Sequence, residues 1–160
     1  MKRPFIIGVM GGGSASKADL QAAFDLGKRI AGQGWILLNG GRNAGIMAAS
    51  AKGASEGGGV TVGILPDEQP SASAPHIQIP ICTGMGSARN MINVLSSDVV
   101  VACPGGAGTI SEIALALKHD KTVISMHFPT GSLFASYRKQ KRLIEVETPE
   151  EVIEKIKKIL

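Results

Sequence analysis

Residues 98–109 read DVVVACPGGAGT, a run of apolar residues that leads into a glycine-rich turn. The first six residues predict a strand that is apolar on both faces, as a parallel strand covered by helices on both sides must be. The segment 109–119 carries apolar residues at helical spacing and predicts a helix directly after the turn. This stretch therefore predicts a buried strand, a tight turn and a helix in succession.

The same alternation of short β-branched runs with longer helical patterns fills the chain. The predicted strands are 5–10, 35–39, 60–65, 77–81, 98–103, 122–126 and 143–146. The predicted helices are 17–31, 45–55, 87–96, 109–119 and 149–160. Seven strands interleaved with five helices predict an α/β fold, a Rossmann-like doubly wound three-layer sandwich with a mainly parallel sheet of about seven strands. We expect one nucleotide- or phosphate-binding domain, 1–160.

The composition excludes several classes of protein. Hydrophobic residues make up 44% of the chain and charged residues 19%, which excludes a disordered or collagen-like chain. Four Phe, one Trp and one Tyr are too few for binding single-stranded nucleic acid on stacked rings. The start of the chain is basic and then apolar, as in a signal peptide, but Gly8 and 11–13 interrupt it, so we interpret it as the first strand. No apolar run approaches the ~20 residues of a membrane span, and we expect a cytoplasmic protein without a membrane partner.

Four basic residues lie in the run YRKQKR at 137–142, which contains no acid. Without these 4, the 17 Lys and Arg fall to 13, which equals the 13 acidic residues, so the net charge of +4 comes from one local patch. Such a patch could hold an anion, a phosphate tail or nucleic acid, and a solvated loop is the simpler interpretation. Because a nucleic-acid site here would leave the glycine-rich turns unexplained, we do not expect nucleic acid to be the ligand.

Glycine-rich segments fall where predicted strands end. GGGS at 11–14 follows the first strand, GG at 40–41 the second, GMG at 84–86 the fourth and GGAGT at 105–109 the fifth. In a doubly wound sheet, ligands bind beyond the carboxyl ends of the strands, where the start of a helix offers free N–H groups to an anion. One glycine pair is most simply a tight turn, but four such turns on one edge predict a phosphorylated ligand. The segments 66–75 and 128–136 are predicted surface loops that could lie over this crevice.

The common nucleotide motifs are absent from these turns. A dinucleotide site needs G-x-G-x-x-G after the first strand and an acid at the end of the second, whereas Ser16 stands at the third glycine position and Asn39 ends the second strand. No lysine has the context of a P-loop, and no serine lies in a G-x-S-x-G elbow. We therefore do not expect NAD binding, P-loop ATP hydrolysis or α/β-hydrolase chemistry.

Arg89 stands beside one of the glycine turns. Ser87 is the predicted N-cap of the helix 87–96, which places Arg89 in the first turn of that helix. A cation there opposes the helix dipole unless an anion shares the site, so Arg89 is a candidate ligand-binding residue. The alternative is a solvent-exposed side chain or an ion pair with an acid such as Asp98.

Glu112 follows Thr109 by three residues, the spacing of a capping box, so it could simply bond the backbone N–H of Thr109. The functional interpretation is a carboxylate at the edge of a phosphate-binding turn, which orients a ribose hydroxyl, activates water or stabilises an oxocarbenium ion. The three histidines share no metal-ligand spacing, and no metal site is predicted. His127, at the end of the sixth strand, is the histidine expected to face the crevice.

The segment PGGAGTISE at 104–112 resembles the PGGxGTxxE motif of the LONELY GUY (LOG) superfamily, also called SLOG or lysine decarboxylase-like. GG at 40–41 with GIM at 45–47 resembles that family's GGGxxGxMG turn, and Arg89 lies where its catalytic arginine precedes PGG. The resemblance spans roughly residues 5–126. Within the superfamily, TGMGSARN and PGGAGTISEIALALK are most similar to the branch that includes the molybdenum cofactor carrier protein.

The resemblance implies one of two functions. LOG enzymes are phosphoribohydrolases, which cleave AMP or a cytokinin ribotide to free base and ribose 5-phosphate; Arg89 and Glu112 would then be catalytic, with no cofactor required. The carrier branch implies that the protein holds the phosphate-bearing pterin of the molybdenum cofactor without turnover. The enzymes usually have Arg-Lys where this chain has Arg89-Asn90, and an acid pair where it has Ser111-Glu112. We therefore expect a binding protein for a phosphorylated, nucleotide-like ligand, with hydrolysis as the alternative.

By the same resemblance, 105–109 would hold the phosphate, Arg89 would orient the ligand and Glu112 would act on the ribose and the attacking water. The candidate ligand-binding residues are Gly12, Gly13, Ser14, Gly40, Gly41, Gly45, Met85, Arg89, Gly105, Gly106, Ala107, Gly108, Thr109 and Glu112. Family members commonly form oligomers by packing helices. We expect a homo-oligomer, a dimer or tetramer, that uses an exposed apolar surface at Ile113 and Leu117.

Overall fold

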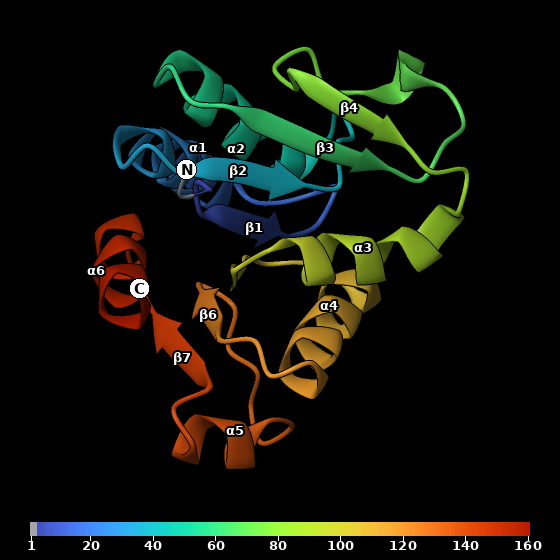
Figure 1. Ribbon diagram of the computed structural model, residues 1–160. Coiled ribbons are helices and arrows are strands. Elements are labelled where there is room, and N and C mark those ends of the chain that lie inside the picture. Colours follow the sequence, from blue (N-terminus) through green and yellow to red (C-terminus); the bar gives the residue numbers. More distant parts are fainter. Residues whose placement is uncertain (1–2) are drawn as a thin grey trace.

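Seven parallel strands form one sheet in the order β4-β3-β2-β1-β5-β6-β7 (Figure 1). This computed structural model describes residues 3–160. The strands are β1 (Ile6–Met10), β2 (Ile36–Asn39), β3 (Thr61–Leu65), β4 (Ile79–Cys82), β5 (Val99–Ala102), β6 (Val123–Met126) and β7 (Leu143–Val146). The predicted α/β fold is confirmed; the predicted unit 1–160 also includes residues 1 and 2, which lie outside the described range.

Helices occupy most of the segments between the strands. They are α1 (Lys17–Gly32), α2 (Gly45–Glu56), α3 (Arg89–Ser96), α4 (Ala107–Lys118), α5 (Ala135–Lys139) and α6 (Pro149–Ile159), with short 3-10 turns η1 (Pro70–Ala72) and η2 (Gly86–Ala88). Within residues 3–160, no helix is long and apolar enough to cross a membrane.

The basic run 137–142 is not the solvated loop that was expected. Its first three residues belong to α5, a sixth helix that the sequence pattern did not reveal because five residues are too few to display helical periodicity. Arg138 forms an ion pair with Glu145, and Arg142 forms one with Asp120. Half of the positive charge of this run is therefore paired with neighbouring acids.

Two apolar cores lie on opposite faces of the sheet. Helices α1, α2 and α6 pack on one face, whereas α3 and α4 pack on the other (Figure 1). Neighbouring residues of β5 point to different cores: Val101 belongs to the core that includes Leu26 of α1, and Val100 belongs to the core that includes Ile113 of α4. This arrangement explains why β5 is apolar at every position.

The prediction of an exposed apolar surface at Ile113 and Leu117 is wrong. Ile113 is 0% and Leu117 is 2% exposed, because both belong to the core between α4 and the sheet. Side chains three or four positions apart share one face of a helix, so Ala116 is buried with them. The large apolar side chain of α4 that remains accessible is Ile110, which is 40% exposed.

Helices α1 and α2 pack with their backbones in close contact at two glycines. A Cβ added at Gly27 would lie well under 3.0 Å from the carbonyl oxygen of Ser50, and one added at Gly53 would lie equally close to the carbonyl oxygen of Phe24. Only a hydrogen atom fits at either position. The two glycines thus hold α2 against α1, and this contact positions the start of α2 at the end of β1.

Replacing Gly27 by Ala is expected to lower the free energy of unfolding by roughly 1–3 kcal/mol, the usual cost of overpacking. The matched control is Gly32→Ala in the same helix, where an added Cβ meets nothing within 4 Å, and it should cost no stability. Chemical denaturation followed by circular dichroism measures both variants. Equal denaturation midpoints for the two would contradict the close contact between α1 and α2.

Candidate functional site

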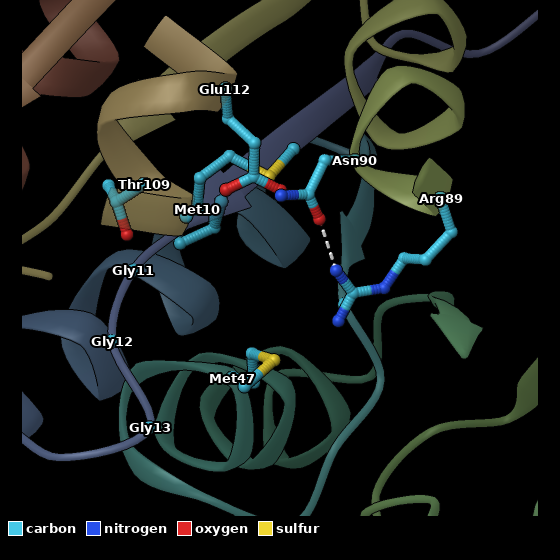
Figure 2. Close-up of a pocket in the computed structure, with 12 residues that line it drawn as sticks. Met10, Gly11, Gly12, Gly13, Met47, Arg89, Asn90, Thr109 and Glu112 are labelled. Atoms are coloured by element: carbon cyan, nitrogen blue, oxygen red, sulfur yellow. Dashed lines mark hydrogen bonds between the residues drawn. The ribbon is translucent and has the colours of Figure 1, made fainter. Parts of the chain in front are cut away.

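A cavity of about 250 Å³ opens at the carboxyl end of β1, next to the point where the strand order reverses between β1 and β5. The first turns of α2, α3 and α4 surround it (Figure 2). Its lining residues are Val9, Met10, Gly11, Gly12, Gly13, Gly40, Met47, Arg89, Asn90, Gly108, Thr109 and Glu112. Doubly wound sheets bind ligands at this position, which makes the cavity the candidate site.

Three turns meet at the backbone of Gly12. Its N–H donates to the carbonyl oxygen of Pro104 over 2.9 Å, and its carbonyl oxygen accepts from the N–H of Ile46 over 3.0 Å. Gly45 has a φ of +48°, and a Cβ there would collide with the same carbonyl oxygen. A Cβ at Gly105 would collide with the side chain of Thr109 and the backbone nitrogen of Gly12. The glycines at 45 and 105 are therefore explained by packing alone.

Three other glycines have no such structural reason. A Cβ at Gly106 would meet nothing within 4 Å, and at Gly13 and Gly108 the nearest atoms would lie 3.7 and 3.9 Å away. None of the three has a positive φ, so none is held in the left-handed region that favours glycine. At these positions glycine leaves open space beside the cavity, through which a ligand can approach the backbone.

Helix α4 begins beside this open space. Its N-cap residue, Gly106, has no side chain to accept from the N–H groups of the first turn. Two residues of that turn, Gly108 and Thr109, line the cavity. Unpaired N–H groups and the helix dipole place partial positive charge at the start of a helix, so this end of α4 favours an anion.

Arg89 is the first residue of α3, and its guanidinium lines the cavity across from α4 (Figure 2). Its Nε donates to the carbonyl oxygen of Ile64 at the end of β3 over 2.8 Å, and its Nη1 donates to Oδ1 of Asn90. Burial lowers the pKa of Arg89, and the field of Glu112 opposes this effect. Arginine remains cationic under such conditions, so the site contains one fixed positive charge.

One expectation and one alternative for the segment around Arg89 are wrong. Ser87 does not cap α3, because the turn η2 runs directly into the helix and places Ala88 at the N-cap position, without a side-chain hydrogen bond. Asp98 is not the partner of Arg89, since its carboxylate binds Arg3 at the other end of the sheet's central strand, where it also accepts from the N–H of Ile6.

Glu112 is 6% exposed and its carboxyl group points into the cavity (Figure 2). Its Oε1 accepts a hydrogen bond from Nδ2 of Asn93 on α3 over 2.9 Å. Burial raises the pKa of Glu112 to about 6, and the bond from Asn93 and the charge of Arg89 limit the rise. The alternative of a capping box with Thr109 is wrong, because α4 begins before Thr109 and directs Glu112 toward α3.

His127 does not reach this cavity. It lines a separate cavity of about 300 Å³ at the ends of β6 and β7. Its Nδ1 lies 3.1 Å from Oδ1 of Asp19 in α1, and its Nε2 contacts the carbonyl oxygen of Glu147. The expectation failed because β5 separates β6 from β1 in the sheet. In the described part of the chain, no group of three or more His, Cys, Asp or Glu side chains is placed to hold a metal ion.

The structure brings half of the candidate residues into the cavity wall. Those that line it are Gly12, Gly13, Gly40, Arg89, Gly108, Thr109 and Glu112. Those that lie outside the wall are Ser14, Gly41, Gly45, Met85, Gly105, Gly106 and Ala107. The remaining lining residues, which are not among the candidate ligand-binding residues predicted from the sequence, are Val9, Met10, Gly11, Met47 and Asn90. These residues lie at the end of a strand or in the first turn of a helix, and these positions in the sequence could have identified them as cavity-lining residues.

The chain is similar to proteins of a known family. Residues 4–153 match the model of the SLOG cluster4 family. The chain belongs to the SLOG cluster4 family. This membership confirms the LOG-like superfamily that was predicted from the glycine motif at 104–112.

This SLOG cluster4 protein is similar to solved structures of a molybdenum cofactor binding protein and of a molybdenum cofactor carrier protein. It is 46% identical to the molybdenum cofactor binding protein from the phototrophic bacterium Rippkaea orientalis, with a TM-score of 0.93 over 99% of both chains. It is 42% identical to the molybdenum cofactor carrier protein from Chlamydomonas reinhardtii, with a TM-score of 0.88 over 98% of both chains. The predicted carrier branch is therefore confirmed as the branch of the superfamily to which this fold is similar.

The SLOG cluster4 protein is also similar to an enzyme. It is 34% identical over 116 residues to the cytokinin riboside 5′-monophosphate phosphoribohydrolase of Mycobacterium tuberculosis. The match covers 66% of this chain and 60% of the enzyme, so the chain spans less than two thirds of that enzyme's length.

Replacing Glu112 by Gln is expected to stabilise the SLOG cluster4 protein near neutral pH. Folding raises the pKa of Glu112 from 4.5 to about 6, so its ionised form opposes folding. The neutral form of Glu112 is compatible with burial, so below pH 4.5 the carboxyl group costs the fold nothing. This stability is lost as the pH rises through about 6 and the buried group ionises. The shift corresponds to about 2 kcal/mol, so Glu112→Gln should raise the free energy of unfolding at neutral pH by up to that amount.

Denaturation of both proteins across the pH range measures this effect. The two should unfold at similar denaturant concentrations at low pH, because Glu112 is then neutral in both the folded and the unfolded chain. A Glu112→Gln protein that is less stable than the wild type at neutral pH would contradict the buried, high-pKa carboxyl group.

Proposed function

We propose that this SLOG cluster4 protein binds the phosphate of a nucleotide-like ligand, and that its ligand is the molybdenum cofactor, held without turnover. The observation that carries the proposal is the open space at Gly13, Gly106 and Gly108 beside the uncapped start of α4. Nothing in the backbone or packing requires glycine there, whereas a phosphate needs both the space and the N–H groups.

Arg89 supplies the charge that the backbone lacks. Its guanidinium faces the cavity while Nε stays bonded to the carbonyl oxygen of Ile64, so one edge of the group is held and the other is directed to the ligand. A guanidinium and a set of helix N–H groups on facing walls suit a phosphate that lies between them. The cavity of about 250 Å³ is below the usual range for a whole drug-sized ligand, so it fits the phosphate and the adjoining atoms.

Two neighbouring residues favour retention of the ligand over its hydrolysis. Asn90 follows Arg89 and accepts a hydrogen bond from its guanidinium, where the enzymes of the superfamily usually have a lysine. Ser111 precedes Glu112 and bonds the carbonyl oxygen of Gly108 over 2.6 Å instead of adding a second carboxylate. The site therefore has less charge to stabilise a transition state, while its anion-binding groups are intact. The similarity to the cofactor-binding protein of Rippkaea orientalis over 99% of both chains supports the same conclusion.

A second candidate function is the hydrolysis of a nucleoside 5′-monophosphate to free base and ribose 5-phosphate. The observation that favours it is the buried carboxyl group of Glu112, whose pKa of about 6 lies near the working range of a general acid or base. Glu112 would orient the ribose and take a proton from the attacking water, and Arg89 would hold the phosphate. The similarity to the phosphoribohydrolase of Mycobacterium tuberculosis supports this alternative.

The proposed phosphate site is tested by adding a single methyl group at Gly108 or Gly13, which line the cavity. Gly108→Ala should fold with unchanged stability, because the nearest atom to the new Cβ lies 3.9 Å away, yet it should weaken AMP binding at least about tenfold by filling the ligand's space. Gly13→Ala should behave in the same way. Isothermal titration calorimetry measures the affinity, and Gly32→Ala, which lies away from the cavity, should leave it unchanged. Wild-type affinity in both cavity variants would place the phosphate elsewhere.

An experiment that follows the fate of the ligand distinguishes the carrier function from the enzymatic function. Purified protein is incubated with a panel of nucleoside monophosphates, and free base is measured by chromatography, with Glu112→Ala as the control. We expect no release of base, together with protection of added molybdenum cofactor from decay. Release of base that the Glu112→Ala change abolishes would refute the carrier function and support the hydrolase.

A further inference from the structure

Asn93 on α3 is a buried polar residue that local structure does not explain. It is 0% exposed, and its Nδ2 donates to Oε1 of Glu112 over 2.9 Å. Its Oδ1 is also buried, and no donor in residues 3–160 reaches it. A buried carbonyl oxygen without a hydrogen bond lowers stability, so this asparagine is costly to the fold.

Asn39 shows what a structural asparagine looks like in the same protein. It is equally buried, but its Oδ1 accepts from the N–H of Gly41 over 2.8 Å and its Nδ2 donates to Met47 and Ser50. Asn39 thereby fixes the turn after β2. Asn93 makes one side-chain hydrogen bond within the described chain, and its partner, Glu112, is a residue of the candidate site.

The position of Asn93 would otherwise suit an aliphatic side chain. It faces α4, whose residues on the same side of the helix, Ile113 and Ala116, are buried in the apolar core together with Val94 of α3. Leucine has nearly the same shape as asparagine and has no polar atom to leave unpaired. Stability alone therefore does not account for Asn93.

We propose that Asn93 is a positioning residue that holds the carboxyl group of Glu112 toward the cavity in both its ionised and its protonated form. The Nδ2 of Asn93 donates to the carboxylate; after the amide rotates by half a turn, Oδ1 accepts from the protonated acid. An ammonium group, which only donates, would not accept from the protonated form. The inference rests on the proposed ligand site, since Asn93 acts on a ligand only through Glu112.

The charged residue near Glu112 does not form a hydrogen bond with its carboxyl group, whereas Asn93 does. Arg89 of α3 is the charged group whose field acts on Glu112, and it is bonded to Ile64 and Asn90 instead of to the carboxylate. The strand residues that pack on this side of the sheet, Met10 of β1 and Ala102 of β5, are apolar. Asn93 is thus the group that bonds the carboxyl directly.

The test compares Asn93→Leu with the wild-type protein in two measurements that need no ligand. NMR of ¹³C-labelled glutamate carboxyl groups follows the titration of Glu112, and denaturation follows stability. We expect the titration midpoint of Glu112 in Asn93→Leu to rise by about one pH unit, because the charge-assisted hydrogen bond that the ionised form loses is stronger than the bond that the protonated form loses. Below pH 4.5, where Glu112 is neutral in both the folded and the unfolded chain, the denaturation midpoint should stay nearly equal, because the variant also removes the amide atom that is left unpaired.

Asn39→Leu is the matched control for a structural asparagine and should lower the denaturation midpoint clearly. An unmoved Glu112 titration in Asn93→Leu, or a loss of stability as large as that of Asn39→Leu, would overturn the proposal. Titration of AMP at several pH values adds a third measurement, in which the pH dependence of affinity should shift with the Glu112 midpoint. Absence of AMP binding in the wild type would count against the proposed function, whereas the two ligand-free measurements would still decide the role of Asn93.

Discussion

The peptide group of Gly12 is the contact on which the rest of the site depends. Its N–H bonds the turn that follows β5, and its carbonyl oxygen bonds the start of α2. Side chains cannot enter a junction this tight, so Gly45 and Gly105 are required beside it. Because β1 and β5 flank the reversal of strand order, this junction sets the distance between α2 and α4 and so creates the cavity.

Opposite charges share the cavity without a direct bond between them. Arg89 is held by the carbonyl oxygen of Ile64, and Glu112 is held by Asn93. Burial favours the neutral form of Glu112, whereas arginine keeps its charge, so the site becomes more positive as Glu112 takes up a proton. An anionic ligand would favour the same protonation. This balance explains why one set of residues is compatible with holding a phosphate and with general acid–base chemistry.

The sequence predicted the fold well because its two strongest signals do not depend on distant contacts. Apolar runs such as β5 and the helical spacing of α4 are local patterns, and both elements appear within two residues of their expected ends. Two of the errors, both about where a helix begins, share one physical origin. Ser87 and the capping spacing of Glu112 depend on where a helix begins, and that was set by η2 and by packing at Gly105. Helix α5 was too short to show a period.

The sequence by itself determined the parallel sheet, the glycine turns at the carboxyl ends of its strands and the family motif at 104–112. Each of these features depends on a pattern of residues that are close together in the chain. Only the tertiary structure decided which glycines are structural and which leave space for a ligand, since that depends on atoms from other turns. It also decided that Glu112 is buried against Asn93 and that His127 lies in another cavity. Packing between elements far apart in the chain sets burial, and burial sets the chemistry of a carboxyl group.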